Sequence, residues 1–370
     1  MKKANFLKRL AALKSVLSEI KADTLWITQP ENRRYYSGFK AEDTSFTESS
    51  GSLVINQKES LLVTDSRYTT EAQKEAFAFE VVTLKKPIAE ELPAILRKLG
   101  TKVLGFETAH LTWELHRQMQ NALKRFSPPI RLAPIRALLE NMRIIKDRDE
   151  LRAMAAASQL MGDILEEIIP RLRAGISEKS VAWEIEGLVR EGGAEGLAFP
   201  SIVASGPNSA LPHAVPTERK IRDREPITLD VGLRMDGYCC DMTRTVFIDE
   251  PKPAIKKIYR TVREAQVAGL DAVRSNVMSN IPDKAARDII EKAGFGPFFG
   301  HALGHGVGLA AHESPRLAPR KPETLMEGMV VTVEPGVYIP HKGGVRLEEM
   351  VAIGKRGIKI LTQCNYLYDF

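Results

Sequence analysis

Cysteine is scarce in this chain, with only Cys239, Cys240 and Cys364 among 370 residues. So few cysteines exclude a disulfide framework in a chain of this length, and adjacent cysteines rarely bridge each other. A thiolate metal site needs more cysteines at ligand spacing, which the sequence does not supply. We therefore expect reduced cysteines without a metal-binding role.

Long apolar runs are also missing, because no stretch approaches the roughly 18 uninterrupted apolar residues that a membrane helix needs. The N-terminal sequence MKKANFLKRLAALKSVLSEIK starts with basic residues but soon returns to charged ones. It therefore lacks the apolar core and the cleavage site of a secretory signal peptide. These absences predict a cytoplasmic protein with no membrane partner.

Aromatic residues form only 6% of the chain, although its net charge is +6. A basic chain could bind nucleic acid, but its Lys and Arg residues are scattered. No basic stripe is interleaved with aromatic side chains that would stack on bases. The composition therefore predicts a solvated basic surface and no nucleic-acid partner.

A length of 370 residues exceeds one typical domain and predicts two. Apolar positions at helical spacing predict an amphipathic helix over residues 5–20, packed on its own domain rather than lying on a membrane surface. Short β-rich runs then alternate with helical patterns, which predicts an α/β layer with helices covering a sheet. The expected strands are 23–28, 51–55, 60–64 and 102–106, and the expected helices are 67–79, 89–99 and 111–124.

The pattern breaks at Ser127-Pro128-Pro129 and again at Pro134, as at a linker. We place a domain boundary there, which gives domains 1–135 and 136–370. Long helices, and strands that carry glycine, histidine and carboxylates, follow the boundary. The expected helices are 147–169, 177–192, 253–274 and 282–293.

The segment ITLDVGLRMDGYCCDMTRTVF, residues 227–247, predicts a β-hairpin. Its two β-rich runs flank Asp236-Gly237, a dipeptide favoured in two-residue hairpin turns. With this turn, Thr243 lies opposite Asp230, and Asp241 is a diagonal neighbour of Asp230 on one face, roughly 7–8 Å away between backbones. Two such carboxylates repel each other unless cations lie between them. Taken alone, the pair would more often be solvated surface aspartates.

Three of the seven histidines, His301, His305 and His312, lie within residues 298–313. The spacing of the first two would suit zinc ligands on a helix, but the glycines of GHGVG (304–308) disfavour a helix there. These glycines also resemble a dinucleotide-binding loop, although the strand, helix and acidic residue that should accompany one are not in place. We infer that the glycines let the backbone pass close to a ligand, with imidazoles at the site.

Two further strands are expected near the C-terminus. GMVVTVEPGVYIP (328–340) predicts a buried strand that ends at Glu334, where packing explains a carboxylate poorly. GGVRLEEMVAI (343–353) predicts another strand, in which Arg346 and Glu348 share one face. That phase selects Glu348 as the inward carboxylate, and Glu349 is then solvated or salt-bridged.

A set of four carboxylates and one imidazole then lies on strands or strand ends of one domain. Such an oxygen-rich set suits manganese, cobalt or iron better than a structural zinc. Two bridged ions roughly 3.5–4 Å apart polarise a carbonyl and lower the pKa of a shared water. The five residues are Asp230, Asp241, His305, Glu334 and Glu348.

The sequence resembles the pita-bread metallopeptidases, which include aminopeptidase P, prolidase, creatinase and methionine aminopeptidase. ITQPENRRYYSGF and LLVTDSRYTTEA are similar to the N-terminal domain of the first three, and LENMRIIKDRDELRAM to the opening of the catalytic domain. GPNSALPHAVP, LDVGLRMDGYCCDMTRT, HALGHGVGLAAHE, VEPGVYIP and GGVRLEE match the catalytic motifs in order. The resemblance implies a two-domain α/β and α+β fold, with a creatinase-like N-terminal α/β domain followed by a pita-bread catalytic domain.

The resemblance also implies roles for individual residues. The five residues above would bind two divalent metal ions, with manganese preferred and cobalt, zinc or iron as alternatives. Glu334 would also be the general base toward a bridging water. His213 would line the substrate site, and His312 would contact the scissile carbonyl or the developing oxyanion. His301 and Arg346 are carried over from matching positions, with Arg346 behind the carboxylates.

The implied activity is hydrolysis of Xaa-Pro bonds in proline-containing peptides by a homodimer. An Xaa-Pro aminopeptidase, which releases the N-terminal residue, is the first expectation, and an Xaa-Pro dipeptidase (prolidase) is the alternative. A methionine aminopeptidase is disfavoured by the N-terminal domain, and a creatinase by the complete set of metal ligands. A non-catalytic binding protein on the same fold is the alternative from a different class.

Overall fold

The computed structural model describes residues 2–17, 19–43, 45 and 47–370. The chain forms two compact units, Met1–Met142 and Arg143–Phe370. The boundary expected near residue 135 lies just before helix α6 (Leu138–Ile144). None of the described helices combines the length and the apolar character needed to cross a membrane.

A mixed six-stranded sheet with helices forms the first unit. Its strands are β1 (Thr24–Ile27), β2 (Ser52–Asn56), β3 (Ser60–Asp65), β4 (Glu80–Leu84), β5 (Val103–Glu107) and β6 (Arg131–Ile135). Its helices are α1 (Lys3–Val16), α2 (Pro30–Ser37), α3 (Thr69–Glu75), α4 (Ile88–Lys98) and α5 (Trp113–Leu123). The sheet order is β4-β3-β2-β1-β5-β6. The central pairs β1–β2 and β2–β3 are antiparallel, and the remaining pairs are parallel.

All four strands expected in this unit are present as β1, β2, β3 and β5. The four expected helices correspond to α1, α3, α4 and α5, although residue 18 of the expected 5–20 helix lies outside the described residues. The sequence patterns missed β4, β6 and α2. Helix α2 buries Asn32 and Arg33, so it lacks the apolar stripe by which amphipathic helices are recognised.

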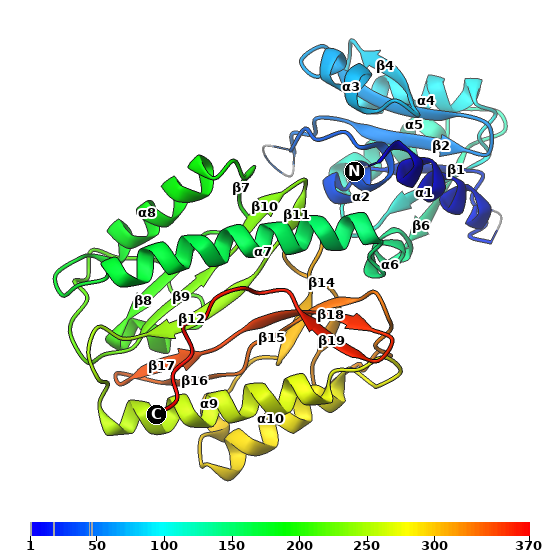
Figure 1. Cartoon of the computed structure of the whole chain (residues 1–370). Helices are drawn as coiled ribbons and strands as arrows, with labels where there is room; N and C mark the ends of the chain where they lie inside the picture. Colours follow the sequence, from blue (N-terminus) through cyan, green and yellow to red (C-terminus); the bar gives the residue numbers. More distant parts are fainter. Residues whose placement is uncertain (1, 18, 44, 46) are drawn as a thin grey trace. The chain divides into compact units, whose positions relative to one another are not determined.

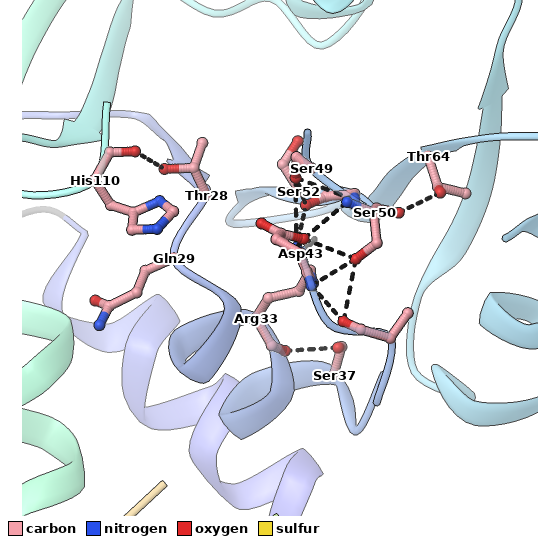
Figure 2. A network of polar contacts seen from close by, with 12 residues as sticks. Thr28, Gln29, Arg33, Ser37, Asp43, Ser49, Ser50, Ser52, Thr64 and His110 are labelled. Atoms are coloured by element: carbon pink, nitrogen blue, oxygen red, sulfur yellow. Dashed lines mark hydrogen bonds and ion pairs between the residues drawn. The ribbon is translucent and has the colours of Figure 1, made fainter. Parts of the chain in front are cut away.

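Arg33 is fully buried because its guanidinium is surrounded by acceptors (Figure 2). It donates to the carbonyl oxygens of Ala41 and Gly51 at 2.5 and 2.6 Å. It also pairs with Asp43 at 3.0 Å. The hydroxyl of Ser50 accepts from Arg33 at 2.7 Å and donates to Asp43 at 2.9 Å. The network fastens the described part of the segment between α2 and β2 onto α2.

Helices and four small sheets form the second unit (Figure 1). Its helices are α7 (Arg148–Ile168), α8 (Glu178–Glu191), α9 (Pro253–Ala272) and α10 (Asn280–Lys292). Its first strands are β7 (Gly196–Leu197), β8 (Ile202–Ser205), β9 (Ile227–Val231), β10 (Leu233–Met235), β11 (Tyr238–Cys239) and β12 (Met242–Val246). The later strands are β13 (Gly304–Gly306), β14 (Glu313–Leu317), β15 (Val330–Val333), β16 (Gly336–Ile339), β17 (Gly343–Arg346), β18 (Glu349–Gly354) and β19 (Gly357–Ile360).

Two pairs of helices pack on these strands. Helix α7 lies against β10 and β11, and α8 lies against β7 and β8. Helix α9 packs against α10 and against β15, β16 and β17. Tyr259 of α9, Val331 of β15 and Val351 of β18 belong to one buried apolar cluster. All four helices expected in this unit are present. Their apolar sides pack against the strands that carry the polar residues, or against a helix that does.

The hairpin expected over residues 227–247 is confirmed with its register. Asp236 and Gly237 form the turn with φ of 51° and 86°, as a turn that needs two positive φ angles requires. Thr243 pairs with Asp230, as predicted. The hairpin also bends between β11 and β12, where Cys240 and Asp241 stand outside both strands.

The expectation of one strand over 343–353 is wrong. The chain forms β17 and β18, which belong to different sheets: β17 pairs with β16, and β18 pairs with β15 and β19. Leu347 and Glu348 lie between the two strands, and the backbone N–H of Glu348 donates to Thr243 O at 3.1 Å. The break occurs because the chain changes partners there, which side-chain alternation alone does not reveal.

Candidate metal centre

Four carboxylates and one imidazole converge in the second unit. Asp241, His305 and Glu348 each offer a ligand atom within 4.8 Å of those of the other two. Glu334 Oε1 lies 3.2 Å from His305 Nε2, and Asp241 Oδ2 lies 3.6 Å from the same nitrogen. The charge of Asp230 acts on both Asp241 and Glu348. The structure therefore brings all five predicted ligands together.

A close approach of two strands places His305 beside Glu334. A Cβ atom on Gly304 would lie 2.0 Å from Thr332 O, so only glycine lets β13 run this near to β15. The Thr332 hydroxyl then accepts from the His305 backbone N–H at 3.1 Å and donates to Glu334 Oε1 at 3.1 Å. The prediction that these glycines form no helix is confirmed, because Gly304–Gly306 is a strand.

The tautomer of His305 is fixed by a backbone carbonyl. His305 Nδ1 lies 3.0 Å from Gly306 O, which can only accept, so Nδ1 carries the proton. In the neutral ring, Nε2 therefore carries the lone pair that a metal ion would accept, whereas in the protonated ring Nε2 donates to Glu334. A carbonyl that orients the second nitrogen in this way is typical of metal-binding histidines.

The carboxylates perturb one another strongly. Burial and then the charge of Glu348 raise the pKa of Asp241 well above its usual range. Burial and then the charge of Glu334 raise the pKa of Glu348 in the same way. Burial also opposes ionisation of Glu334, but the hydrogen bond and charge of His305 outweigh it and lower its pKa to about 2. Ionising all these carboxylates together requires positive charge at the cluster.

Two carboxylate oxygens of the cluster are evidence for cation binding. Asp230 Oδ1 and Glu348 Oε1 are buried and have no hydrogen-bond partner among the described residues. Burying an acceptor of this kind without a partner is costly and uncommon. Both oxygens belong to the predicted ligand set, and oxygen donors with one imidazole suit hard divalent cations. The residues present therefore fit divalent metal ions.

Arg346 connects the acidic cluster to the strands behind it. Its Nη2 donates to Asp230 Oδ2, and its Nε donates to Thr243 Oγ1 at 3.2 Å. The Thr243 hydroxyl donates in turn to Glu348 Oε2 at 2.7 Å. Thr243, which the hairpin register places opposite Asp230, thus hydrogen-bonds a second carboxylate of the predicted set. Arg346 also donates to Tyr338 Oη at 2.7 Å.

Tyr338 links Arg346 to His301. His301 Nδ1 lies 2.8 Å from Ala302 O and therefore carries the proton, so its Nε2 accepts from the Tyr338 hydroxyl at 2.9 Å. Burial raises the pKa of Tyr338 to about 12, so the hydroxyl keeps its proton at neutral pH. Sequence reasoning missed this residue because a tyrosine in an apolar strand usually indicates core packing.

Two further histidines lie beside the acidic cluster. The ring centroid of His312 lies 4.2 Å from that of His305. Burial and then the charge of His305 lower the pKa of His312, and the charge of His213 contributes in the same direction. His213 is exposed, on the loop that follows the short helix η2 (Gly206–Ala210). The structure therefore places both predicted substrate-site histidines near the centre.

The second unit contains a carboxylate-rich centre that fits divalent cations, and an α/β unit precedes it in the chain. These two features define a two-domain metallohydrolase. Residues 152–355 match the metallopeptidase family M24, and residues 9–145 match the creatinase/prolidase N-terminal domain. The chain belongs to metallopeptidase family M24.

Individual relatives are similar over almost their whole length. An Xaa-Pro dipeptidase of Pyrococcus furiosus is 35% identical, over 96% of this chain and 98% of that protein. The structure of an Xaa-Pro dipeptidase from Bacillus anthracis has a TM-score of 0.90 and 36% identity, covering 97% of this chain and 98% of that one. An X-Pro aminopeptidase from Thermotoga maritima has a TM-score of 0.87 and 34% identity, covering 96% and 97%.

These similarities confirm the resemblance to the pita-bread metallopeptidases and the two-domain fold with a creatinase-like N-terminal domain. They also confirm the prediction of a metallo-exopeptidase. The family and the geometry together support a divalent metal centre. The roles of the individual site residues stay predictions.

Proposed function

We propose that this chain is an Xaa-Pro dipeptidase that hydrolyses dipeptides with proline in the second position. The motifs favoured an Xaa-Pro aminopeptidase, with the dipeptidase as the alternative. The relatives support the alternative better, because Xaa-Pro dipeptidases from two organisms are 35% and 36% identical to the chain. The observation that carries the proposal is the convergence of Asp230, Asp241, His305, Glu334 and Glu348.

In this proposal the five converging residues hold two divalent ions, preferably manganese, with cobalt, iron and zinc as alternatives. Such ions, when bound, polarise a peptide carbonyl and acidify a water molecule. Glu334 accepts the proton of the attacking water. Without metal, the protonated His305 lowers the pKa of Glu334 to about 2, and bound cations would likewise favour the ionised carboxylate. Arg346 keeps Asp230 in place through their hydrogen bond.

The histidines act on the substrate. Burial and the charge of His305 lower the pKa of His312, so the ring is neutral at pH 7 and can donate one N–H to the carbonyl oxygen as negative charge develops there. His213 lines the substrate site beside His312 and supplies a second hydrogen bond near the scissile bond. His301 supports this arrangement through Tyr338 and Arg346.

Proline explains why such a centre is useful. The Xaa-Pro bond is a tertiary amide without an N–H, and the proline ring fixes φ. A peptidase that docks an extended chain through that N–H loses a contact at this bond. Acting on the carbonyl oxygen avoids the need for the contact.

Three further properties complete the proposal. The chain forms a homodimer, as the resemblance predicts, and works in the cytoplasm, as the composition predicts. Both statements stay predictions. Its partners are proline-containing peptides, without nucleic acid or membrane. Sedimentation of the purified chain tests the dimer directly.

The activity is tested with protein stripped of metal by chelation and then dialysed. Xaa-Pro dipeptides and Xaa-Pro-Yaa tripeptides are each incubated with and without manganese or cobalt, beside an Asp241→Ala variant as the control. We expect metal-dependent cleavage of the dipeptides, no cleavage of the tripeptides, and loss of activity in the variant.

Other outcomes would change the assignment. Release of the first residue from tripeptides would make the chain an Xaa-Pro aminopeptidase, as the relative from Thermotoga maritima is named. If no peptide were cut while metal was demonstrably bound, the chain would be a binding protein on this fold.

A further inference from the structure

Glu178 is a buried carboxylate outside the acidic cluster. It is the first residue of helix α8, and its exposed fraction is 0%. A helix N-terminus favours negative charge, but a carboxylate removed from water also needs hydrogen-bond donors to remain ionised. The position of these donors shows which part of the chain Glu178 holds.

Three residues surround the carboxylate with donors. Oε1 accepts from the backbone N–H and the hydroxyl of Ser205 at 2.8 and 2.7 Å. Oε2 accepts from the backbone N–H and the hydroxyl of Thr217 at 3.1 and 2.6 Å. The Asn208 amide donates to both oxygens at 3.1 Å. Hydrogen bonds to a charged group are individually stronger than neutral ones.

These donors lie at both ends of the loop that carries His213. Ser205 and Asn208 precede the histidine, and Thr217 follows it. The Glu178 side chain therefore links the two ends of the loop, together with direct bonds from Asn208 to Thr217 Oγ1 at 3.3 Å and from Arg219 to Ser205 Oγ at 2.5 Å. The backbone reinforces this junction, because Lys179 N–H donates to Thr217 O at 3.1 Å.

Further anchors hold the beginning of the loop, where the Gly206 N–H donates to Pro226 O at 2.8 Å. The Gly344 N–H of β17 donates to Ser209 Oγ at 2.8 Å, which connects the loop to the strand that also carries Arg346. His213 itself is exposed, next to the buried Ala214, and the Glu178–Thr217 junction follows it on the C-terminal side. The direction of the exposed imidazole thus depends on the Glu178 junction.

We propose that Glu178 is a positioning residue that fixes His213 relative to His312 and so sets the substrate contact of His213. The inference rests on the proposed peptide hydrolysis, because that activity assigns His213 to the substrate. Glu178 itself touches neither the substrate nor the acidic cluster.

A double-mutant cycle tests the proposal. Glu178→Gln keeps the shape of the side chain but replaces one acceptor with an NH₂ group, which faces the donors of Thr217 or of Ser205. We expect kcat/KM to fall by up to about 100-fold, the scale on which small misplacements act. In a His213→Ala background the same substitution should cost less than about twofold, because the two residues act through one contact.

The matched control is Glu184→Gln, the same substitution at an exposed residue of α8, which should leave kcat/KM unchanged. Thr217→Val removes a single hydroxyl donor and serves if Glu178→Gln fails to fold; it should show the same dependence on His213. Equal losses with and without His213 would overturn the proposal, because they would indicate general damage to the fold.

A second readout separates this inference from the proposed function. NMR of histidine-labelled protein reports the environment of the His213 ring without any turnover. We expect Glu178→Gln and Thr217→Val to shift the His213 signal and leave the His301 signal in place. If the wild-type protein cut no Xaa-Pro peptide, the proposed function would fail, and an unshifted His213 signal would separately overturn the positioning role.

Discussion

The Thr243 hydroxyl donates to Glu348 Oε2 at 2.7 Å and holds one oxygen of a carboxylate whose other oxygen has no hydrogen-bond partner among the described residues. The bond crosses from β12 of the hairpin to the two-residue break between β17 and β18. One oxygen is thereby oriented by the protein, and the other is left for a cation. The same hydroxyl accepts from Arg346 at 3.2 Å, so one threonine hydrogen-bonds both Glu348 and Arg346.

Thr243→Val should therefore weaken metal binding without unfolding the chain. The substitution keeps the branched shape but frees Glu348 to rotate, and losing such a supporting hydrogen bond typically costs about 10–100-fold in metal affinity. Titration of metal-stripped protein with manganese measures the affinity. Thr243→Ser, which keeps the hydroxyl, should bind as the wild type does; equal weakening in both variants would contradict the prediction.

Gly304→Ala should displace His305 from Glu334. The added Cβ would lie 2.0 Å from Thr332 O, so β13 must move away from β15 and carry the imidazole from Glu334. Gly300→Ala is the matched control, because its Cβ would meet no atom within 4 Å. We expect lower metal affinity for the first variant and an unchanged affinity for the second. Similar affinities for the two would show that the close approach does not position His305.

Glu313 follows His312 in the chain, and its titration should lower the free energy of unfolding at acid pH. It pairs with Arg143 at 2.9 Å and with Lys146 at 3.2 Å, and all three side chains are at most 5% exposed. Burial alone would raise the pKa of Glu313, but the two cations outweigh it and lower that pKa. The folded-state pKa is depressed, so the stabilisation is present above the unfolded value near 4.3 and is lost as pH falls through the folded value.

Glu313→Gln removes the buried carboxylate that Arg143 and Lys146 share and should lower the unfolding free energy by about 3–5 kcal/mol at neutral pH. Urea unfolding of the second unit measures this, with Glu327→Gln at an exposed position as the control. A loss no larger than that of the control would show that the ion pairs do not stabilise the segment carrying His312.

Glu107 should have the opposite pH dependence in the first unit. It accepts from the backbone N–H groups of Thr28 and Gln29 beside the start of α2, but burial raises its pKa from 4.5 to about 6. The unfolded chain therefore ionises first, and the contribution of Glu107 to stability falls by about 2 kcal/mol in total as pH rises from below 4.5 to above 6.

Glu107→Gln should remove this fall, since glutamine does not titrate. Hydrogen exchange of the β1 and β2 amides in the full chain, corrected for intrinsic rates, gives the local stability from pH 4.5 to 7. Glu114→Gln, at an exposed position of α5, should keep the wild-type slope. A slope that persists in Glu107→Gln would assign it to another group.

Local patterns predicted the hairpin and its register because two positive-φ residues, Asp236 and Gly237, permit one turn geometry. They placed Asp230 and Asp241 near each other for the same reason, although Asp241 lies in the bend between β11 and β12 and not in a strand. They failed at 343–353, where alternation continues through Glu348 although the strand changes partners. Alternation records which face a side chain takes but not which strand lies beside it.

Supporting residues were the hardest to predict from sequence. Tyr338 looks like core packing, and Glu178 looks like an acidic residue at a helix start. Their roles depend on groups far away in the chain: Tyr338 meets His301, and Glu178 meets Thr217. Such contacts come from tertiary packing, which one sequence without its fold does not specify.

The most direct test of the metal centre is the number of ions that each chain holds. Metal-stripped protein is equilibrated with manganese, dialysed and analysed for bound metal, beside Asp241→Asn and the exposed Glu327→Gln as control. We predict two ions per chain in the wild type and the control, and fewer in Asp241→Asn. Absence of bound metal from the wild type, or an unchanged number in Asp241→Asn, would contradict the assignment of these carboxylates as ligands.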